Sequence, residues 1–290
     1  MFEGLFTALV TPFRGGALDE PALRELVERQ VAAGVDGIVP CGSTGESATL
    51  APEEHCRVVE IAVEAARGRV QVVAGTGSNN TREAIDLTER AKRAGADGAL
   101  LISPYYNKPT QDGIVAHYAA VARATSFPLL VYNIPGRTAS NIAPSTMARL
   151  ADLEHVVGVK ESSGDLVQVS QVIARCPEEF AVLSGDDALA LPLLALGGRG
   201  AISTTSNVAP AEMGELVRAF RRGDLARARA LHYRLLPLMD ALFCETNPIP
   251  VKAALALQGL IGDEIRLPLT PVTDPNRERL RVVLKELALL

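Results

Sequence analysis

The stretch Val156-Val157-Gly158-Val159-Lys160 is a short apolar run that ends in one cation. A continuous run, without alternation of apolar and polar residues, is typical of a parallel strand that is buried on both faces. Similar runs recur at a nearly constant interval, at residues 5–10, 37–40, 70–74, 98–102, 129–132, 180–184 and 200–203. The sequence therefore predicts eight buried parallel strands.

Helical patterns fill the intervals between these runs, at residues 20–33, 52–66, 81–94, 111–124, 144–150 and 167–174. Gly34, Gly95 and Gly197 stand where helices are expected to end, because glycine readily adopts the left-handed conformation there. Strand and helix alternating eight times is the order of a (β/α)8 barrel. Beyond Ser203 the pattern is purely helical. We therefore expect a barrel domain over residues 1–208 and a C-terminal helical extension over residues 209–290.

A doubly wound open sheet is the competing architecture, and its dinucleotide fingerprint is G-x-G-x-x-G after the first strand. That motif is absent from the sequence. The nearest approach, Gly75-Thr76-Gly77, is interpreted as a turn between a strand and a helix. Gly197-Gly198-Arg199-Gly200 precedes a strand and is interpreted as a tight turn on the opposite face of the barrel from the chemistry.

The composition is that of an ordinary globular protein: 290 residues, 48% apolar, 22% charged and a net charge of −5. These values exclude the disordered, collagen-like and disulfide-scaffold classes. The arginines form no stripe with aromatic residues, which argues against a nucleic-acid partner. No apolar run approaches the ~20 residues of a membrane span, so no membrane association is expected.

The N-terminal stretch is apolar but carries Glu3 and Pro12 and lacks a basic leader, so it is interpreted as a buried strand and not as a signal peptide. The four cysteines are widely spaced, without a CxxC pair, which favours reduced thiols. We therefore expect a cytoplasmic protein.

Barrel active sites lie at the carboxyl ends of the strands, and here those ends are polar. Lys160 is the sharpest feature, because the other four of the five lysines stand in helical or loop contexts where a solvated face is expected. A lysine that starts inside the barrel is desolvated, which favours a neutral amine able to form a Schiff base. The alternative is an ion pair with Glu161 or Asp186, although alternation along the strand turns Glu161 away.

Other strand ends supply groups suited to that chemistry. Tyr132 is one strand away from Lys160, and Ser43 and Tyr106 can extend a hydroxyl relay for proton transfer. Backbone N–H groups in Gly42–Gly45, with the hydroxyls of Ser43 and Thr44, suit a carboxylate at the start of the next helix. Arg137 at the barrel mouth suits a second carboxylate. Each feature has an ordinary structural interpretation when it is taken alone.

Metal chemistry is not indicated. None of the four histidines falls at a strand end, and no pair of them has ligand spacing. No residue pattern requires a cofactor.

A set of motifs is similar to one known family. They are AGTG at 74–77, SPYYNKP at 103–109, YNIPGRT at 132–138, GVKESSGD at 158–165, SGDD at 184–187, NPIPVK at 247–252 and GSTGES at 42–47. In this order and spacing they resemble the 4-hydroxy-tetrahydrodipicolinate synthase (dihydrodipicolinate synthase) family of pyruvate-dependent class I aldolases. The resemblance covers essentially the whole chain.

The resemblance implies a lyase that condenses pyruvate with L-aspartate 4-semialdehyde in diaminopimelate and lysine biosynthesis. Lys160 forms the Schiff base, and Tyr132, Ser43 and Tyr106 form the proton relay, Tyr106 reaching into the neighbouring subunit of a homotetramer built as a dimer of dimers. Arg137 is implied to bind the carboxylate of the semialdehyde, and Ser43 and Thr44 that of pyruvate. Ile202 and Gly185 are implied to line the pocket. Most of the family has threonine where Ser43 stands, so this chain keeps the hydroxyl but loses the methyl group that restricts χ1.

The resemblance also implies a lysine feedback site at a dimer interface. The residues matching that site are Ser47, Ala48, His55, Asn79, Glu83 and Tyr105, while Pro52 replaces a residue that is often histidine. Glu83 and His55 are expected to hold the ammonium and carboxylate ends of the effector; the ordinary interpretation of both is placement on a helix surface.

Two other functions remain open at this point. An N-acetylneuraminate lyase or keto-sugar-acid aldolase shares the lysine, the tyrosine and the glycine-hydroxyl loop, but the arginine in YNIPGRT favours the synthase. A non-catalytic barrel that senses a keto acid needs no nucleophile, so Lys160 and the three hydroxyl residues argue against it.

Overall fold

The computed structural model describes residues 2–290, and its eight parallel strands close into a barrel in the order β1-β10-β9-β8-β7-β6-β5-β4. The strands are β1 (Gly4–Ala8), β4 (Gly37–Val39), β5 (Gln71–Gly75), β6 (Gly98–Ile102), β7 (Leu129–Asn133), β8 (Val156–Glu161), β9 (Ala181–Ser184) and β10 (Gly200–Ser203). Each predicted apolar run overlaps one of them, with ends that differ by no more than two residues. The predicted (β/α)8 barrel is confirmed.

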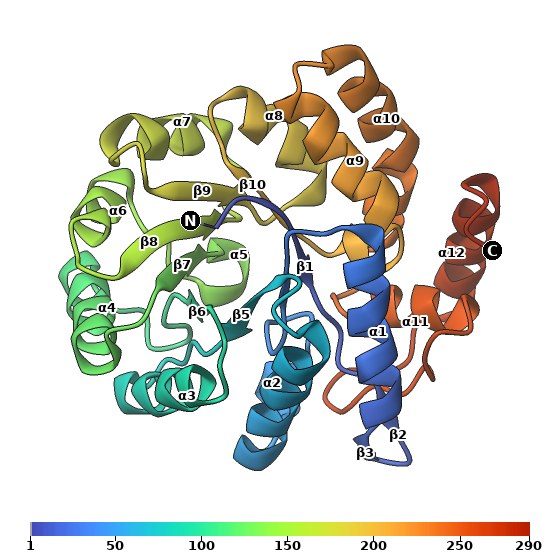
Figure 1. The fold of residues 1–290 in the computed structure, drawn as a ribbon, viewed down its shortest axis with the longest axis horizontal. Helices are drawn as coiled ribbons and strands as arrows, with labels where there is room; N and C mark the ends of the chain where they lie inside the picture. The colour runs from blue at the N-terminus through green and yellow to red at the C-terminus, as the bar shows by residue number, and fades with distance from the viewer. Residues whose placement is uncertain (1) are drawn as a thin grey trace. The chain divides into compact units, whose positions relative to one another are not determined.

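The described chain divides into two compact units, of which the first comprises residues 2–3 and 73–202. Its strands β6, β7 and β8 pair in parallel, and its helices pack in chain order, α3 against α4, α4 against α6 and α6 against α7 (Figure 1). The helices are α3 (Thr81–Arg93), α4 (Gln111–Thr125), α5 (Pro135–Thr138), α6 (Pro144–Ala151), α7 (Leu166–Arg175) and α8 (Ala190–Ala195), with a 3-10 turn η2 (Asp187–Leu189).

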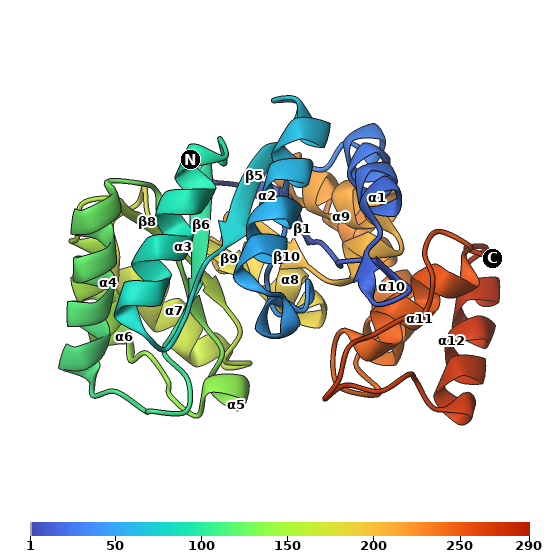
Figure 2. The same ribbon diagram turned by 90° about the horizontal axis from the view of Figure 1, so that it is seen from below.

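The second unit comprises residues 4–72 and 203–290. Its helices are α1 (Glu20–Ala33), α2 (Pro52–Ala66), α9 (Pro210–Arg221), α10 (Leu225–Ala241), α11 (Ile249–Leu257) and α12 (Asp274–Glu286), with the 3-10 turns η1 (Ser47–Thr49) and η3 (Thr205–Asn207). The predicted C-terminal helices are therefore present, and α12 packs against both α10 and α11 (Figure 2).

The second unit also contains a small antiparallel pair, β2 (Phe13–Arg14) with β3 (Ala17–Leu18). Sequence analysis missed it because two-residue strands carry no periodic pattern. The glycine helix ends, in contrast, are where they were expected: Gly34 has φ +72° and donates to the carbonyls of Gln30 and Val31. Among residues 2–290, no helix combines the length and apolar character that a membrane span requires.

Candidate active site

Lys160 and Tyr132 face each other on neighbouring strands. The parallel register of β7 and β8 pairs Tyr132 with Lys160, and the Lys160 Nζ lies 4.3 Å from the centre of the Tyr132 ring. Each residue is only 6% exposed. An amine and a phenol held together away from bulk water can exchange protons with a bound carbonyl compound.

The two carboxylates that were considered as ion-pair partners for Lys160 are engaged elsewhere. Glu161 accepts hydrogen bonds from Asn133 Nδ2 at 3.1 and 3.3 Å and from the Ser163 backbone N–H at 2.7 Å. Asp186 accepts from the Ala188 N–H at 3.0 Å. Within the described residues 2–290, Lys160 forms no ion pair. The alternative in which Lys160 forms an ion pair with Glu161 or Asp186 is therefore not observed.

Glu161 is the residue after Lys160 in β8, so its side chain points to the opposite face of the strand. Burial raises the pKa of Glu161 above its ordinary value, while hydrogen bonds from Ser163 and Asn133 act in the opposite direction. Asn133 also donates to Asn141 Oδ1 at 2.9 Å and accepts from the Ile142 N–H at 3.1 Å. This network joins the ends of β7 and β8 to the loop that follows α5.

Gly185 packs directly on the aliphatic part of Lys160. A Cβ atom at position 185 would lie 2.7 Å from Lys160 Cε and 1.9 Å from Ser162 Oγ, both closer than real Cβ contacts. Only glycine leaves room for the lysine stem in this position. Ile202, the other predicted lining residue, is fully buried in β10.

Loop 42–47 follows β4 and is held by its own hydrogen bonds. The N–H groups of Gly45 and Ser47 donate to the Gly42 carbonyl at 3.0 and 3.3 Å, and that of Glu46 donates to the Ser43 carbonyl at 3.2 Å. These three N–H groups are therefore occupied, and the loop leads into η1 and not directly into a helix of several turns. Of the N–H groups expected to bind a carboxylate, that of Gly45 is therefore engaged within the loop. Carboxylate binding by Ser43 and Thr44 stays a prediction.

Thr44 is buried and its hydroxyl has a partner from the C-terminal extension. Asn247 Nδ2 donates to Thr44 Oγ1 at 2.9 Å. Ser43 beside it is half-buried. Thr11, after β1, donates from its hydroxyl to the Gly45 carbonyl at 2.7 Å. The loop that carries both proposed carboxylate-binding hydroxyls is thus tied at two further points.

Two of the predicted site residues, Arg137 for carboxylate binding and Tyr106 for proton transfer, lie at the surface. Arg137 is exposed on the four-residue helix α5. Tyr106 is 88% exposed and has φ +71°, a left-handed conformation that is uncommon for an aromatic residue. Both side chains are accessible to molecules approaching from outside.

The residues matching the lysine effector site fall in both units. In the first unit, Asn79 Nδ2 donates to the Tyr105 carbonyl at 3.1 Å, and Ser78 Oγ donates to the Glu83 carboxylate. In the second unit, Ser47 and Ala48 lie in η1. His55 is buried in α2 and not on a helix surface.

Sequence analysis was wrong about Lys252, which was assigned to a solvated face. Its side chain is 1% exposed, and its Nζ lies 2.5 Å from Glu46 Oε1. It also missed Asn247, although both residues belong to the NPIPVK motif. A local signal for its burial was present, because Lys252 is the one polar residue of α11, a helix that is otherwise apolar on all sides and is buried from Ile249 to Leu255. The partner Glu46 could not be inferred locally, because it lies 206 residues away along the chain.

Comparison with known proteins gives a consistent result. The profile of the Dihydrodipicolinate synthetase family matches residues 1–287. A 4-hydroxy-tetrahydrodipicolinate synthase of Nitratidesulfovibrio vulgaris is 58% identical over 290 residues, which are 100% of this chain and 99% of that protein. The crystal structure of dihydrodipicolinate synthase from Aquifex aeolicus matches with a TM-score of 0.98 and 50% identity and covers 99% of each chain. That of the enzyme from Cyanidioschyzon merolae with lysine bound has a TM-score of 0.97 at 41% identity and covers 100% of this chain and 99% of that one.

The packing of Gly185 against Lys160 gives a first prediction. The variant Gly185→Ala should slow adduct formation at Lys160 about tenfold or more, since overpacking of this kind is worth ~1–3 kcal/mol. Reductive trapping of a keto acid with borohydride measures it. Gly113→Ala, whose Cβ would approach no atom closer than 3.3 Å, should react at the original rate. Unchanged trapping in Gly185→Ala would show that the lysine stem does not depend on this glycine.

Proposed function

The chain belongs to the Dihydrodipicolinate synthetase family, and on that premise we propose that Lys160 is the amine on which its reaction takes place. The enzyme is a lyase, a 4-hydroxy-tetrahydrodipicolinate synthase that condenses pyruvate with L-aspartate 4-semialdehyde in diaminopimelate and lysine biosynthesis. The observation that carries the role of Lys160 is its position: buried at the end of β8, over the Tyr132 ring and without a carboxylate partner within residues 2–290.

The first step follows from the chemistry of a primary amine. The neutral amine of Lys160 attacks the ketone carbon of pyruvate, a C–N bond forms, and the ketone oxygen leaves as water after it has been protonated. Loss of a proton from the adjacent methyl group then gives an enamine, whose carbon forms a new C–C bond to the aldehyde carbon of the second substrate while the aldehyde oxygen takes up a proton. The amino group of the second substrate then attacks the imine carbon, which closes a ring, breaks the C–N bond to Lys160 and returns its free amine. Each stage moves a proton, so a relay beside the amine is required.

We assign that relay to hydroxyl groups. Tyr132 is the member next to Lys160, which its register and ring contact support. Ser43 and Tyr106 extend it, in keeping with the motifs shared with the family. Pyruvate's carboxylate is received by Thr44 and Ser43, and the semialdehyde's carboxylate by Arg137, whose exposed position suits the substrate that arrives second. Gly185 and Ile202 line the pocket.

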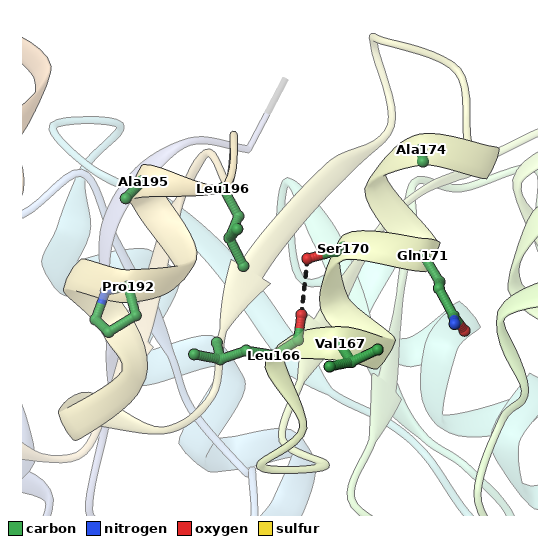
Figure 3. Close-up of a pocket in the computed structure, with 8 residues that line it drawn as sticks. All are labelled: Leu166, Val167, Ser170, Gln171, Ala174, Pro192, Ala195 and Leu196. Atoms are coloured by element: carbon green, nitrogen blue, oxygen red, sulfur yellow. Dashed lines mark hydrogen bonds between the residues drawn. The ribbon is translucent and has the colours of Figure 1, made fainter.

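We further propose that the enzyme works as a homotetramer, a dimer of dimers. Tyr106 supports this because an aromatic side chain that is 88% exposed is well placed to reach a second copy. An apolar groove of about 630 Å³ between α7 and α8 gives separate support (Figure 3). Leu166, Val167, Pro192 and Leu196 line it, and Val167 and Leu196 are 67% and 40% exposed. A second copy of this chain is the occupant that we propose.

A lysine effector site is proposed on the matching residues Ser47, Ala48, His55, Asn79, Glu83 and Tyr105. The lysine-bound relative from Cyanidioschyzon merolae supports it. The Glu83 carboxylate suits the effector's ammonium group, and its hydrogen bond from Ser78 fixes its orientation. The cytoplasm is the proposed compartment, which the four free cysteine thiols support.

Trapping with borohydride and pyruvate, followed by peptide mapping, tests the central assignment. The adduct should map to Lys160, and Lys160→Arg should lose both adduct and turnover, because a guanidinium stays protonated and is no nucleophile. Ser43→Ala should keep the adduct while kcat falls about 10²–10⁴-fold, the range for a lost proton-transfer group. Lys285→Arg, on an exposed face of α12, is the matched control. An adduct on another residue would overturn the mechanism.

The groove between α7 and α8 can be tested by sedimentation. Val167→Asp together with Leu196→Asp should convert the assembly to a smaller species at the same concentration, since each copy would bring charges into an apolar contact. Tyr233→Asp, at a residue that is 69% exposed on α10, should leave the assembly unchanged. The proposal fails if the double variant sediments like the wild type.

Feedback is measured by titrating the activity with lysine. Inhibition in the millimolar range is expected, and Glu83→Gln should weaken it about tenfold or more, the equivalent of a lost charge-assisted hydrogen bond. Glu89→Gln, on the same helix and paired with Arg93 at 3.6 Å, is the control. Activity that stays flat across millimolar lysine would end the proposal.

A further inference from the structure

The hydrogen bond between Asn247 and Thr44 joins the C-terminal extension to loop 42–47. Asn247 Nδ2 donates to Thr44 Oγ1 at 2.9 Å, and the two residues are 6% and 3% exposed. Both belong to the same compact unit. The Asn247 side chain, distant in the sequence, is therefore a hydrogen-bond partner of the Thr44 hydroxyl, one of the groups proposed to bind the carboxylate.

The direction of this hydrogen bond matters for the chemistry. A threonine hydroxyl has one proton to donate and two lone pairs that accept. Because the Asn247 amide group donates to the oxygen, the hydroxyl proton has to point away from Asn247. Thr44 is thereby set as a hydrogen-bond donor, and a carboxylate, which only accepts, is the ligand class that such a donor fits.

The other end of the loop is held by a buried ion pair. Lys252 Nζ lies 2.5 Å from Glu46 Oε1, with both side chains 1% exposed. Glu46 Oε2 accepts from the Arg266 N–H at 3.1 Å, and Lys252 Nζ lies 4.4 Å from the centre of the Phe13 ring. Glu46 has φ +53°, a conformation that a glutamate rarely adopts without such contacts.

We propose that Asn247 is a positioning residue that acts through Thr44: it turns the Thr44 hydroxyl proton toward the carboxylate of the keto acid, while the Lys252–Glu46 pair holds the loop in place. The proposal rests on the proposed function of Thr44. The C-terminal extension then has a role in substrate binding as well as in packing, although none of its residues is placed against the substrate.

A double-mutant cycle separates positioning from mere structural support. The variants are Asn247→Ala, Thr44→Val and the two together, with KM and kcat measured for each substrate. Asn247→Ala should raise KM for pyruvate about tenfold, the equivalent of one hydrogen bond, with KM for the semialdehyde within about twofold. In the Thr44→Val background the same change should have no further effect on KM for pyruvate, since the hydroxyl on which it acts is gone.

The isosteric variant Asn247→Asp gives a second measurement, even where the alanine variant folds poorly. A carboxylate can only accept from Thr44, so it would reverse the hydrogen bond and turn the proton away from the substrate. KM for pyruvate should therefore rise more than in Asn247→Ala. Asn276→Ala serves as the matched control, because it removes an amide that donates to Glu245 at 2.7 Å elsewhere in the extension.

The inference is overturned if Asn247→Ala lowers the melting temperature but leaves KM for pyruvate unchanged, or if its effect is equally large in the Thr44→Val background. Failure of the proposed function is recognised separately, in the wild type, as the absence of a pyruvate adduct and of turnover with both substrates. A wild type that reacts normally, with an Asn247→Asp variant that matches it, counts against the positioning role alone.

Discussion

The parallel register between β7 and β8 is the constraint on which the candidate site depends. It sets Lys160 directly opposite Tyr132 and brings the amine to 4.3 Å from the centre of the phenol ring. The period-two alternation of a strand then turns the next residue, Glu161, to the opposite face. A shift of one residue would exchange the lysine for the carboxylate and leave no nucleophile at this position.

The two faces of the same strand ends serve different purposes. On one face the lysine has no carboxylate partner within residues 2–290, so its amine is not committed to an ion pair. On the other face Glu161 and Asn133 form a buried hydrogen-bonded network with the following loops. Burial raises the pKa of the Glu161 carboxyl, and its hydrogen bonds keep that side of the strand satisfied. The network stabilises the strand ends without entering the proposed chemistry.

The C-terminal extension contributes more than coverage of apolar surface. Burial lowers the pKa of Lys252, and the charge of Glu46 acts in the opposite direction. Removal of one partner from such a buried pair typically destabilises a protein by about 3–5 kcal/mol. Together with the contact between Asn247 and Thr44, the pair couples the stability of the extension to the geometry of loop 42–47.

The sequence by itself determined the order of elements, because continuous apolar runs and glycine helix ends are local signals that the barrel does not override. It also singled out Lys160, since a cation at the end of a buried run is visible without a structure. Only the tertiary structure decided which distant side chains contact each other. The apolar residues around Lys252 in α11 are a signal of burial, but neither Lys252 nor Asn247 could be matched to its partner, because the partners lie 206 and 203 residues away along the chain. Such contacts form only when folding brings distant segments of the chain together, so no local sequence pattern predicts them.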